Sequence, residues 1–396
     1  LLDIMAAVSA RPVEPWLDRV SDQPLLAEVP VGVPVVASRT LTDDITEWTL
    51  RNGIRVILKP TNFQDDQILI RGFSPGGTSL ASDAQFVPAT TAVSIVTGGG
   101  IGAFDAIELR KRLSGKVASV SPGISLYEEG FYGSSSPQDL ETLFQLVYLA
   151  FTAPRADPEY FSVFNAQGRQ MLANRNSNPM TVFNDAFNRI LTQDHPRLRP
   201  PTVATFDSTN LEQSLAFYKE RFADAGDYTV ILVGDIDLAV MQPLVEHYLG
   251  GLPATGRKES WRDVGIRAPV GVYRETVYKG VEPRSQTRLS FTGPFDYNDT
   301  TERTVIRLMA MVLETRLHNL LREDKGNTYG VSVSSGTAFL PIESYSVNIG
   351  FGSAPEHADE MAASVLTEIA RLQGEPPSIK EVADIREAAL RQFETD

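Results

Sequence analysis

An internal repeat limits the possible folds of this chain more than any other feature of its sequence. The segment LRKRLSGKVASVS (109–121) aligns with LREDKGNTYGVSVS (321–334), because each reads as a helix end, a glycine and a strand that contains Ser-Val-Ser. Two further pairs follow in the same order, and the offset drifts only from about 212 to about 222 residues: 135–151 over 353–370, and 157–171 over 378–393. The sequence therefore predicts two copies of one α+β unit.

The repeat sets the expected domain limits. Residues 1–47, with a short helix at LLDIMAAVSA and a proline- and valine-rich stretch, read as an interdomain linker. Residues 48–255 form the complete copy, 256–270 form a second linker, and 271–396 form the second copy. The second copy stops before any counterpart of the strand DYTVILVGDID (227–237) and its helix. We therefore expect it to be C-terminally incomplete and the chain to be a fragment.

Composition excludes several classes of protein. The 396 residues are 42% hydrophobic and carry a net charge of −14 without a basic cluster, so non-specific nucleic-acid binding is not expected. No apolar run is long enough to span a membrane. The absence of cysteine excludes disulfides, thiolate metal sites and a cysteine nucleophile. It suits an oxidising compartment, periplasmic or secreted, although it does not assign one.

Local patterns predict the elements of the first copy. WTLRNGIRVIL (48–58) is expected to form a hairpin, since Asn52-Gly53 is a strong two-residue turn signal. DYTVILVGDID reads as a buried strand, and LAVMQPLVEHYLGGLP (238–253) reads as a helix that ends at glycines and a proline. Further helices are expected at 87–97, 104–114, 137–151, 157–174, 180–192 and 208–223, with strands at 68–74 and within 116–136.

Four segments carry a resemblance to a known family: TLRNGIRVILKPT (49–61), GFSPGGTS (72–79), DYTVILVGDIDLAVMQPLVEHYLGGLP (227–253) and LREDKGNTYGVSVSS (321–335). Through these segments the chain resembles the C-terminal half of a pitrilysin/insulinase-type (M16) zinc metallopeptidase. The resemblance implies an α+β fold with tandem copies of an M16-type (LuxS/MPP-like) αβ sandwich domain, the second copy truncated. It also implies that two such halves close around an extended peptide.

The zinc motif of that family has no match here. The motif is His-x-x-Glu-His on a helix, where the two histidines bind zinc and the glutamate activates water. The corresponding helix of the first copy reads ATTAVSIVTGGG (89–100), which contains neither histidine nor acid. The four histidines are scattered over the chain: His195, His247, His318 and His357. We therefore expect no metal ligands and no cofactor in this chain, with zinc held by an upstream half or a separate catalytic subunit.

A second functional element of the family does have a match. The resemblance assigns the pattern Leu-Arg-x6-Tyr to Leu321, Arg322 and Tyr329, whereas the first copy has Leu-Arg at 109–110 without the tyrosine. Arg322 and Tyr329 are accordingly expected to bind the carbonyl of the cleaved peptide bond and to stabilise its oxyanion. Four residues of the following strand are expected to pair with the substrate backbone: Val331, Ser332, Val333 and Ser334.

Three other motifs have plainer explanations. GGGIG (98–102) has Asp105 where a dinucleotide loop needs its third glycine, and a carboxylate there would repel pyrophosphate. The segment HADEM (357–361) has a methionine in place of a second zinc-binding histidine, so acidic residues at a helix start explain it better. Glu128 and Glu129 are adjacent on a predicted strand, so their side chains should face opposite sides and not act together.

The sequence thus predicts the half of a zinc-dependent metalloendopeptidase that closes the substrate chamber, binds peptide and supplies Arg322 and Tyr329. This fragment alone is expected to be inactive. Two alternatives stay open, a non-catalytic scaffold or assembly subunit of the same superfamily and a peptide-binding module without chemistry. The identity of the peptide and the oligomeric state do not follow from the sequence.

Overall fold

The computed structural model describes residues 23–324 and 328–395, apart from the side chains of 322–324, 328–329 and 393–395. The chain divides into two compact units that do not follow the order of the sequence. Unit 1 combines Leu1–Ala173 with Pro201–Arg262, and unit 2 combines Asn174–Pro200 with Asp263–Asp396. Each unit is described below by itself.

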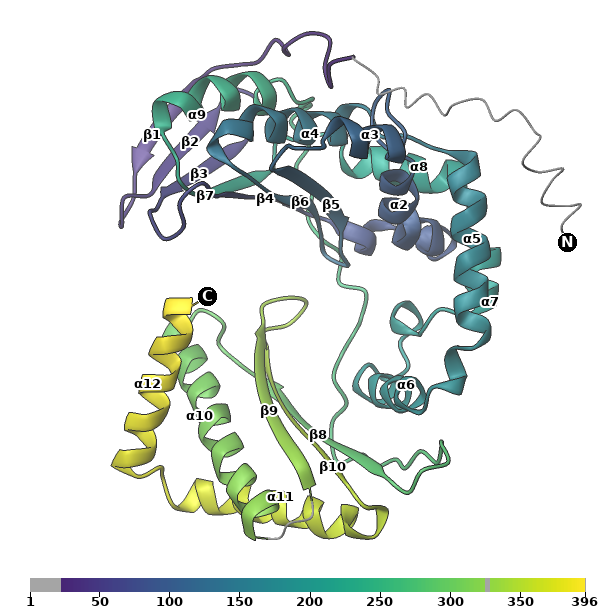
Figure 1. The fold of residues 1–396 in the computed structure, drawn as a ribbon, viewed down its shortest axis with the longest axis vertical. Helices are drawn as coiled ribbons and strands as arrows, with labels where there is room; N and C mark the ends of the chain where they lie inside the picture. Colours follow the sequence, from purple (N-terminus) through teal and green to yellow (C-terminus); the bar gives the residue numbers. More distant parts are fainter. Residues whose placement is uncertain (1–22, 325–327, 396) are drawn as a thin grey trace, which may run out of the picture. The chain divides into compact units, whose positions relative to one another are not determined.

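Unit 1 is built on a seven-stranded sheet in the order β1-β2-β3-β7-β4-β6-β5 (Figure 1). The strands are β1 (Val35–Thr40), β2 (Thr46–Leu50), β3 (Arg55–Pro60), β4 (Ile68–Pro75), β5 (Ala118–Ile124), β6 (Glu128–Ser135) and β7 (Thr229–Gly234). β7 pairs in parallel with β3 and antiparallel with β4, so the last strand of the unit lies inside the sheet. Val230 and Leu232 on β7 are buried, which confirms the buried strand expected from the sequence.

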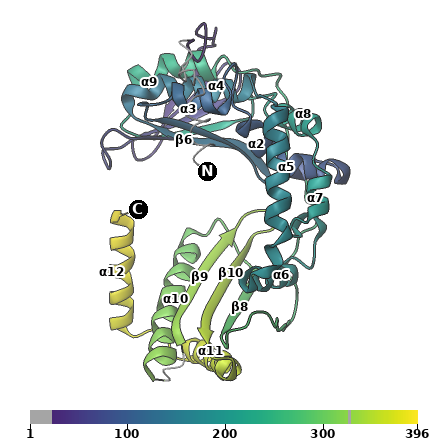
Figure 2. The same cartoon turned by 45° about the vertical axis from the view of Figure 1, so that its right-hand side comes forward.

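Helices pack against this sheet, with α4 and α9 on one of its faces (Figures 1 and 2). The helices of unit 1 are α2 (Phe86–Gly98), α3 (Ala106–Arg112), α4 (Leu140–Thr152), α5 (Pro158–Ala173), α7 (Val203–Asp207), α8 (Leu211–Arg221) and α9 (Leu238–Leu244). A π-helical segment, Val245–Leu249, continues α9. Fully buried side chains from the sheet and the helices form one core, among them Leu58, Phe144 and Leu232.

The hairpin expected at 48–58 is confirmed by the antiparallel pairing of β2 with β3. Gly53 adopts φ +99°, a left-handed conformation that side chains disfavour, so the Asn-Gly pair is what allows the tight turn. The Asn52 side chain donates to the carbonyl oxygen of Leu249 at 2.9 Å, which joins this turn to the end of the α9 region.

Unit 2 contains a three-stranded antiparallel sheet in the order β8-β10-β9. Its elements are α6 (Pro179–Leu191), β8 (Ser285–Pro294), α10 (Thr300–His318), a π-helical segment (Asn319–Asp324), β9 (Thr328–Ala338), β10 (Ser344–Ser353), α11 (Ala358–Gly374) and α12 (Ile379–Thr395). The strand order β8-β10-β9 repeats the order β4-β6-β5 of unit 1, as two copies of one unit require. A smaller core joins α10 and α11 to β10 through Leu313, Leu317, Leu321, Ile349, Phe351, Met361 and Val365.

The helix α6 belongs to unit 2 although the chain on both sides of it belongs to unit 1. The guanidinium of Arg288 on β8 lies over the rings of Phe183 and Phe187, 5.8 and 4.8 Å from their centroids. A cation over aromatic faces is an attractive contact, so α6 is attached to this sheet by specific side chains. The order of the chain gives no sign of this attachment.

Three local differences separate the structure from the sequence-based expectation. Strand β1 lies inside the segment 1–47, where an extended linker was expected, and it pairs with β2. The residues of β1 are mostly exposed, so its sequence shows no alternation of buried and exposed positions. The helix expected at 208–223 begins only at Leu211, because the side chain of Asn210 caps it by accepting from the Gln213 amide at 2.9 Å. The helix expected at 104–114 is shorter, because Asp105 caps it. None of the helices among the described residues has both the length and the apolar character that membrane crossing requires.

Candidate functional site

The two residues expected to act on the peptide bond lie at the ends of one connection in unit 2. Arg322 is in the π-helical segment Asn319–Asp324 that prolongs α10, and Tyr329 is the second residue of β9. Their side chains lie outside the described part of the structure. Their orientation toward a common point therefore stays a prediction.

Packed residues flank both ends of this connection. Leu317 and Leu321, on the side of Arg322, are fully buried in the core of unit 2. Val331 and Val333, on the side of Tyr329, pack against the same core. The backbone positions that carry Arg322 and Tyr329 are thus both set by one small hydrophobic core.

Strand β9 lies at the edge of its sheet and pairs only with β10 among the described residues. The amide of Val333 donates to Oε1 of Glu314 on α10 at 3.4 Å, so it points away from β10. Because alternate residues of an antiparallel strand face the same neighbour, the amide of Val331 points the same way. The hydroxyls of Ser332 and Ser334 are exposed. The edge of β9 away from β10 therefore presents the main-chain groups of Val331 and Val333, and the Val333 amide is already bonded to Glu314.

A network of ion pairs fixes the end of α10. The guanidinium of Arg316 donates to Glu381 on α12, at 2.6 and 3.1 Å, and lies 3.6 Å from Glu368 on α11. Hydrogen bonding to Arg316 lowers the pKa of Glu381 to about 2. A cavity of about 640 Å³ opens beside this network and is lined by Arg316, Leu320, Glu360 and Glu381 among others. The network holds three helices together six residues before Arg322.

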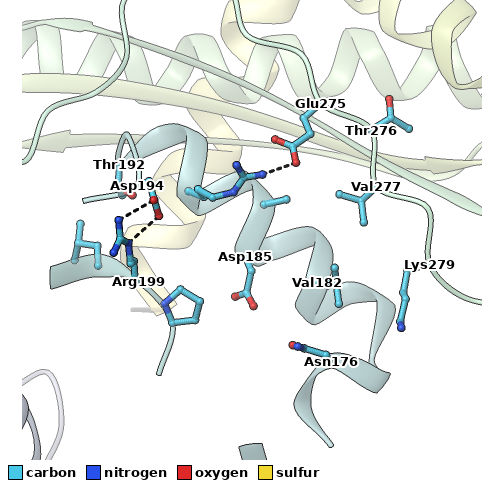
Figure 3. A pocket seen from close by; sticks show the side chains of 14 residues that line it. Asn176, Val182, Asp185, Thr192, Asp194, Arg199, Glu275, Thr276, Val277 and Lys279 are labelled. Carbon is cyan, nitrogen blue, oxygen red and sulfur yellow. Dashed lines mark hydrogen bonds and ion pairs between the residues drawn. The ribbon is translucent and has the colours of Figure 1, made fainter. Parts of the chain in front are cut away.

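A second cavity, of about 630 Å³, lies in unit 2 between α6 and the segment 275–279 (Figure 3). Its charged walls are internally paired. Arg189 donates to Glu275 at 2.5 Å, and Arg199 binds Asp194 through two hydrogen bonds of 3.0 and 2.8 Å. The Arg189–Glu275 pair attaches α6 to the segment that leads into β8. Nothing in the sequence had marked these residues.

The residues that the structure describes do not fit a catalytic zinc ion. The inward side of α2, at the position of the family's zinc helix, is formed by Ala89, Ala92, Ile95 and Val96. No group of three histidine, cysteine, aspartate or glutamate side chains gathers within 23–324 and 328–395 in a way that could hold a metal ion. His195 and His247 contact the carbonyl oxygens of Val264 and Pro30 at 2.9 and 3.2 Å, so both imidazoles have other partners.

Comparison with known proteins gives a consistent result. Residues 208–389 match the family model described as peptidase M16 inactive domain. A zinc protease PQQL-like protein of Arabidopsis thaliana is 25% identical over 402 residues, which cover 96% of this chain and 39% of that protein. This chain thus spans about two fifths of the length of that relative.

Two solved structures share the fold. The periplasmic protease PqqL from Escherichia coli superimposes with a TM-score of 0.84 at 18% identity, over 99% of this chain and 43% of that one. The peptidase M16 inactive domain from Pseudomonas fluorescens superimposes with a TM-score of 0.68 at 19% identity, over 87% of this chain and 83% of that one. At these identities the two likenesses concern the fold alone.

Proposed function

We propose that this chain, of which residues 208–389 match the model of the peptidase M16 inactive domain, is a member of the M16 peptidase family and forms the zinc-free half of a zinc-dependent endopeptidase. In this role it binds an extended peptide and closes the chamber in which the peptide is cleaved. The zinc and the water that it activates come from an upstream half or from a separate catalytic subunit. Alone, the chain is inactive.

The observation that carries the proposal is the contrast between α2 and the α10–β9 connection. The α2 helix presents alanine, isoleucine and valine where metal ligands would be needed. The second copy keeps Arg322 and Tyr329, and the strand that follows them has one edge without a strand partner in the described part of the chain. A half that lost its ligands but kept a cation, a phenol and a peptide-binding edge is suited to holding substrate against another half.

We assign complementary roles to the residues of this region. Arg322 and Tyr329 both donate hydrogen bonds to the carbonyl oxygen of the cleaved bond, and these bonds strengthen as the oxygen gains negative charge. The main-chain groups of Val331 and the carbonyl group of Val333 pair with the peptide backbone, while Ser332 and Ser334 line its path. Backbone pairing gives affinity without demanding one sequence, which suits a peptidase with varied substrates.

The test combines the purified chain with a zinc-bearing half and follows the cleavage of a fluorogenic peptide. Arg322→Ala and Tyr329→Phe are each expected to lower kcat by about 100-fold, since removal of one oxyanion donor typically costs that much. Arg110→Ala is the matched control, because Arg110 is the counterpart of Arg322 in the copy without the tyrosine. Equal rates for the parent and both variants would show that the two residues have no role in cleavage.

Calorimetric titration of the chain with extended peptides, without metal, separates the proposal from its alternatives. A peptidase half binds them, and alternate N-methylation of the peptide abolishes binding because it removes backbone donors. A scaffold subunit binds neither form. A peptide-binding module binds as the peptidase half does but supports no cleavage in the mixed assay.

A further inference from the structure

A buried carboxylate in unit 1 has no role in the proposed function. Glu129 on β6 is 1% exposed, whereas its neighbour Glu128 points outward and pairs with Arg71 at 2.9 Å, which confirms that the two face opposite sides. Oε2 of Glu129 accepts from the Gly77 amide at 2.5 Å, while its Oε1 is buried without a hydrogen-bond partner. Burial raises the pKa of Glu129 to about 7. The nearby carboxylates of Glu259 and Asp227 raise this pKa further, whereas the Gly77 amide and Arg221 lower it.

The cation nearest to Glu129 is shared among three carboxylates. Arg221 on α8 is 1% exposed, and its NH1 lies 3.8 Å from Glu129 and 2.8 Å from Glu259. Its NH2 lies 2.7 Å from Glu220. The hydroxyl of Tyr228, which also feels the charge of Glu129, is buried without a partner. One guanidinium therefore links an interior carboxylate to a carboxylate on the segment that leaves unit 1.

That segment, residues 255–262, is held along its length and is called the strap below. The amides of Thr255 and Arg257 donate to Oδ2 of Asp224 at 2.8 and 3.0 Å. The amide of Glu259 donates to Oδ2 of Asp227 at 3.3 Å.

The far end of the strap is attached in the same way. The amide of Arg262 donates to Oγ of Ser79 at 2.9 Å. The ring of Trp261 meets that of Tyr127 edge-on, with centroids 5.2 Å apart. Unit 1 ends at Arg262, so the strap is the last part of the connection that is bound to it.

We propose that protonation of Glu129 sets how firmly the strap is bound, with Arg221 as the link. When Glu129 is neutral, Arg221 pairs with Glu259 without competition from Glu129, and the strap stays attached. When Glu129 is ionised, its charge draws Arg221 inward and repels the Glu259 carboxylate, so the attachment weakens. The groups that face Glu129 are the Gly77 amide, Arg221, Asp227, Tyr228 and Glu259, and only Glu259 lies on a segment that can leave.

Release of the strap would free residues 255–262 at one of the three points where the chain passes from one unit to the other. The coupling is reciprocal. If ionisation of Glu129 weakens the binding of the strap, release of the strap lowers the proton affinity of Glu129 by the same free energy.

Hydrogen exchange of the full chain at pH 5.5 and pH 8.5, with rates divided by the intrinsic rates at each pH, tests this. In the parent, the strap amides are expected to be less protected at pH 8.5 than at pH 5.5. The loss should be about tenfold for each pKa unit by which release of the strap lowers the pKa of Glu129. Glu129→Gln, which cannot ionise, should keep the strap protected at both pH values. Glu128→Gln is the matched control and should behave like the parent.

Two results would overturn the proposal. One is a parent strap with equal protection at the two pH values. The other is a folded Glu129→Gln variant that loses protection at pH 8.5 as the parent does. If Glu129→Gln does not fold, Glu259→Gln decides, since it removes the strap's own carboxylate and should give low protection without pH dependence. A strap in that variant that still responds to pH contradicts the role of Arg221 as the link.

Discussion

At the scale of single residues, two glycines let β6 approach β4 closely enough to hold Glu129 over the turn at Gly77. Gly130 on β6 stands opposite Phe73, beside the pair that Gly72 makes with Phe131. A β-carbon at position 130 would collide with the carbonyl oxygen of Gly72 and lie 2.9 Å from the α-carbon of Phe73. Both obstacles are backbone atoms, which cannot rotate away.

Gly130→Ala is therefore expected to destabilise unit 1 by about 1–3 kcal/mol, the usual cost of overpacking a well-packed site. Gly123→Ala is the control. Gly123 lies on the neighbouring strand β5 and pairs with Gly130, but a β-carbon added at Gly123 would have no other atom within 4 Å. The free energy of unfolding from urea titration measures both. A cost for Gly123→Ala as large as that for Gly130→Ala would contradict this explanation.

At the scale of elements, an ion pair between Arg316 and Glu381 joins α12 to α10. Glu381 binds Arg316 through two hydrogen bonds of 2.6 and 3.1 Å and also accepts from Ser378 at 2.8 Å. These bonds keep the pKa of Glu381 at about 2, below its ordinary 4.5. Their contribution to stability is present above pH 4.5 and is lost as the pH falls from there toward 2.

We expect Glu381→Gln to weaken the attachment of α12 by roughly 1–2 kcal/mol, the range for a partly exposed, charge-assisted pair. Lys380→Gln is the control, since Lys380 binds Asp384 on the exposed side of the same helix at 2.9 Å. Hydrogen exchange of the α12 amides at pH 7 measures the effect. Unchanged exchange in Glu381→Gln would mean that apolar packing alone holds the helix.

Elements with a local signal could be predicted from the sequence, and contacts between distant segments could not. The Asn52-Gly53 turn determines its hairpin by itself, and the apolar run of 229–234 identified β7 as a buried strand. Glu129 and Arg221 meet only because β6 and α8 pack in one unit, so no spacing in the sequence connects them. The absence of zinc ligands in α2 was evident from composition, whereas the orientation of Arg322 and Tyr329 stays a prediction.

At the scale of the whole molecule, the charge of the chain should select among peptides if the proposed function holds. The 50 acidic residues exceed the 36 basic ones, which gives a net charge of −14. A surface of this charge attracts cations over distances comparable to the Debye length, about 10 Å at 0.1 M salt and about 3 Å at 1 M. Basic peptides should therefore bind more tightly than acidic ones in dilute salt, and the difference should shrink as salt is added.

Fluorescence anisotropy with two labelled peptides of equal length, matched except for lysine against glutamate at two positions, measures this selection. At low salt the lysine peptide should bind several-fold more tightly, because each favourable long-range charge contact is worth a fraction of a kcal/mol in water. At 1 M salt the two affinities should converge, while pairing with the β9 edge, which is common to both peptides, persists. A glutamate peptide that binds as well as the lysine peptide at low salt would show that local charges at the binding edge outweigh the net charge of the chain.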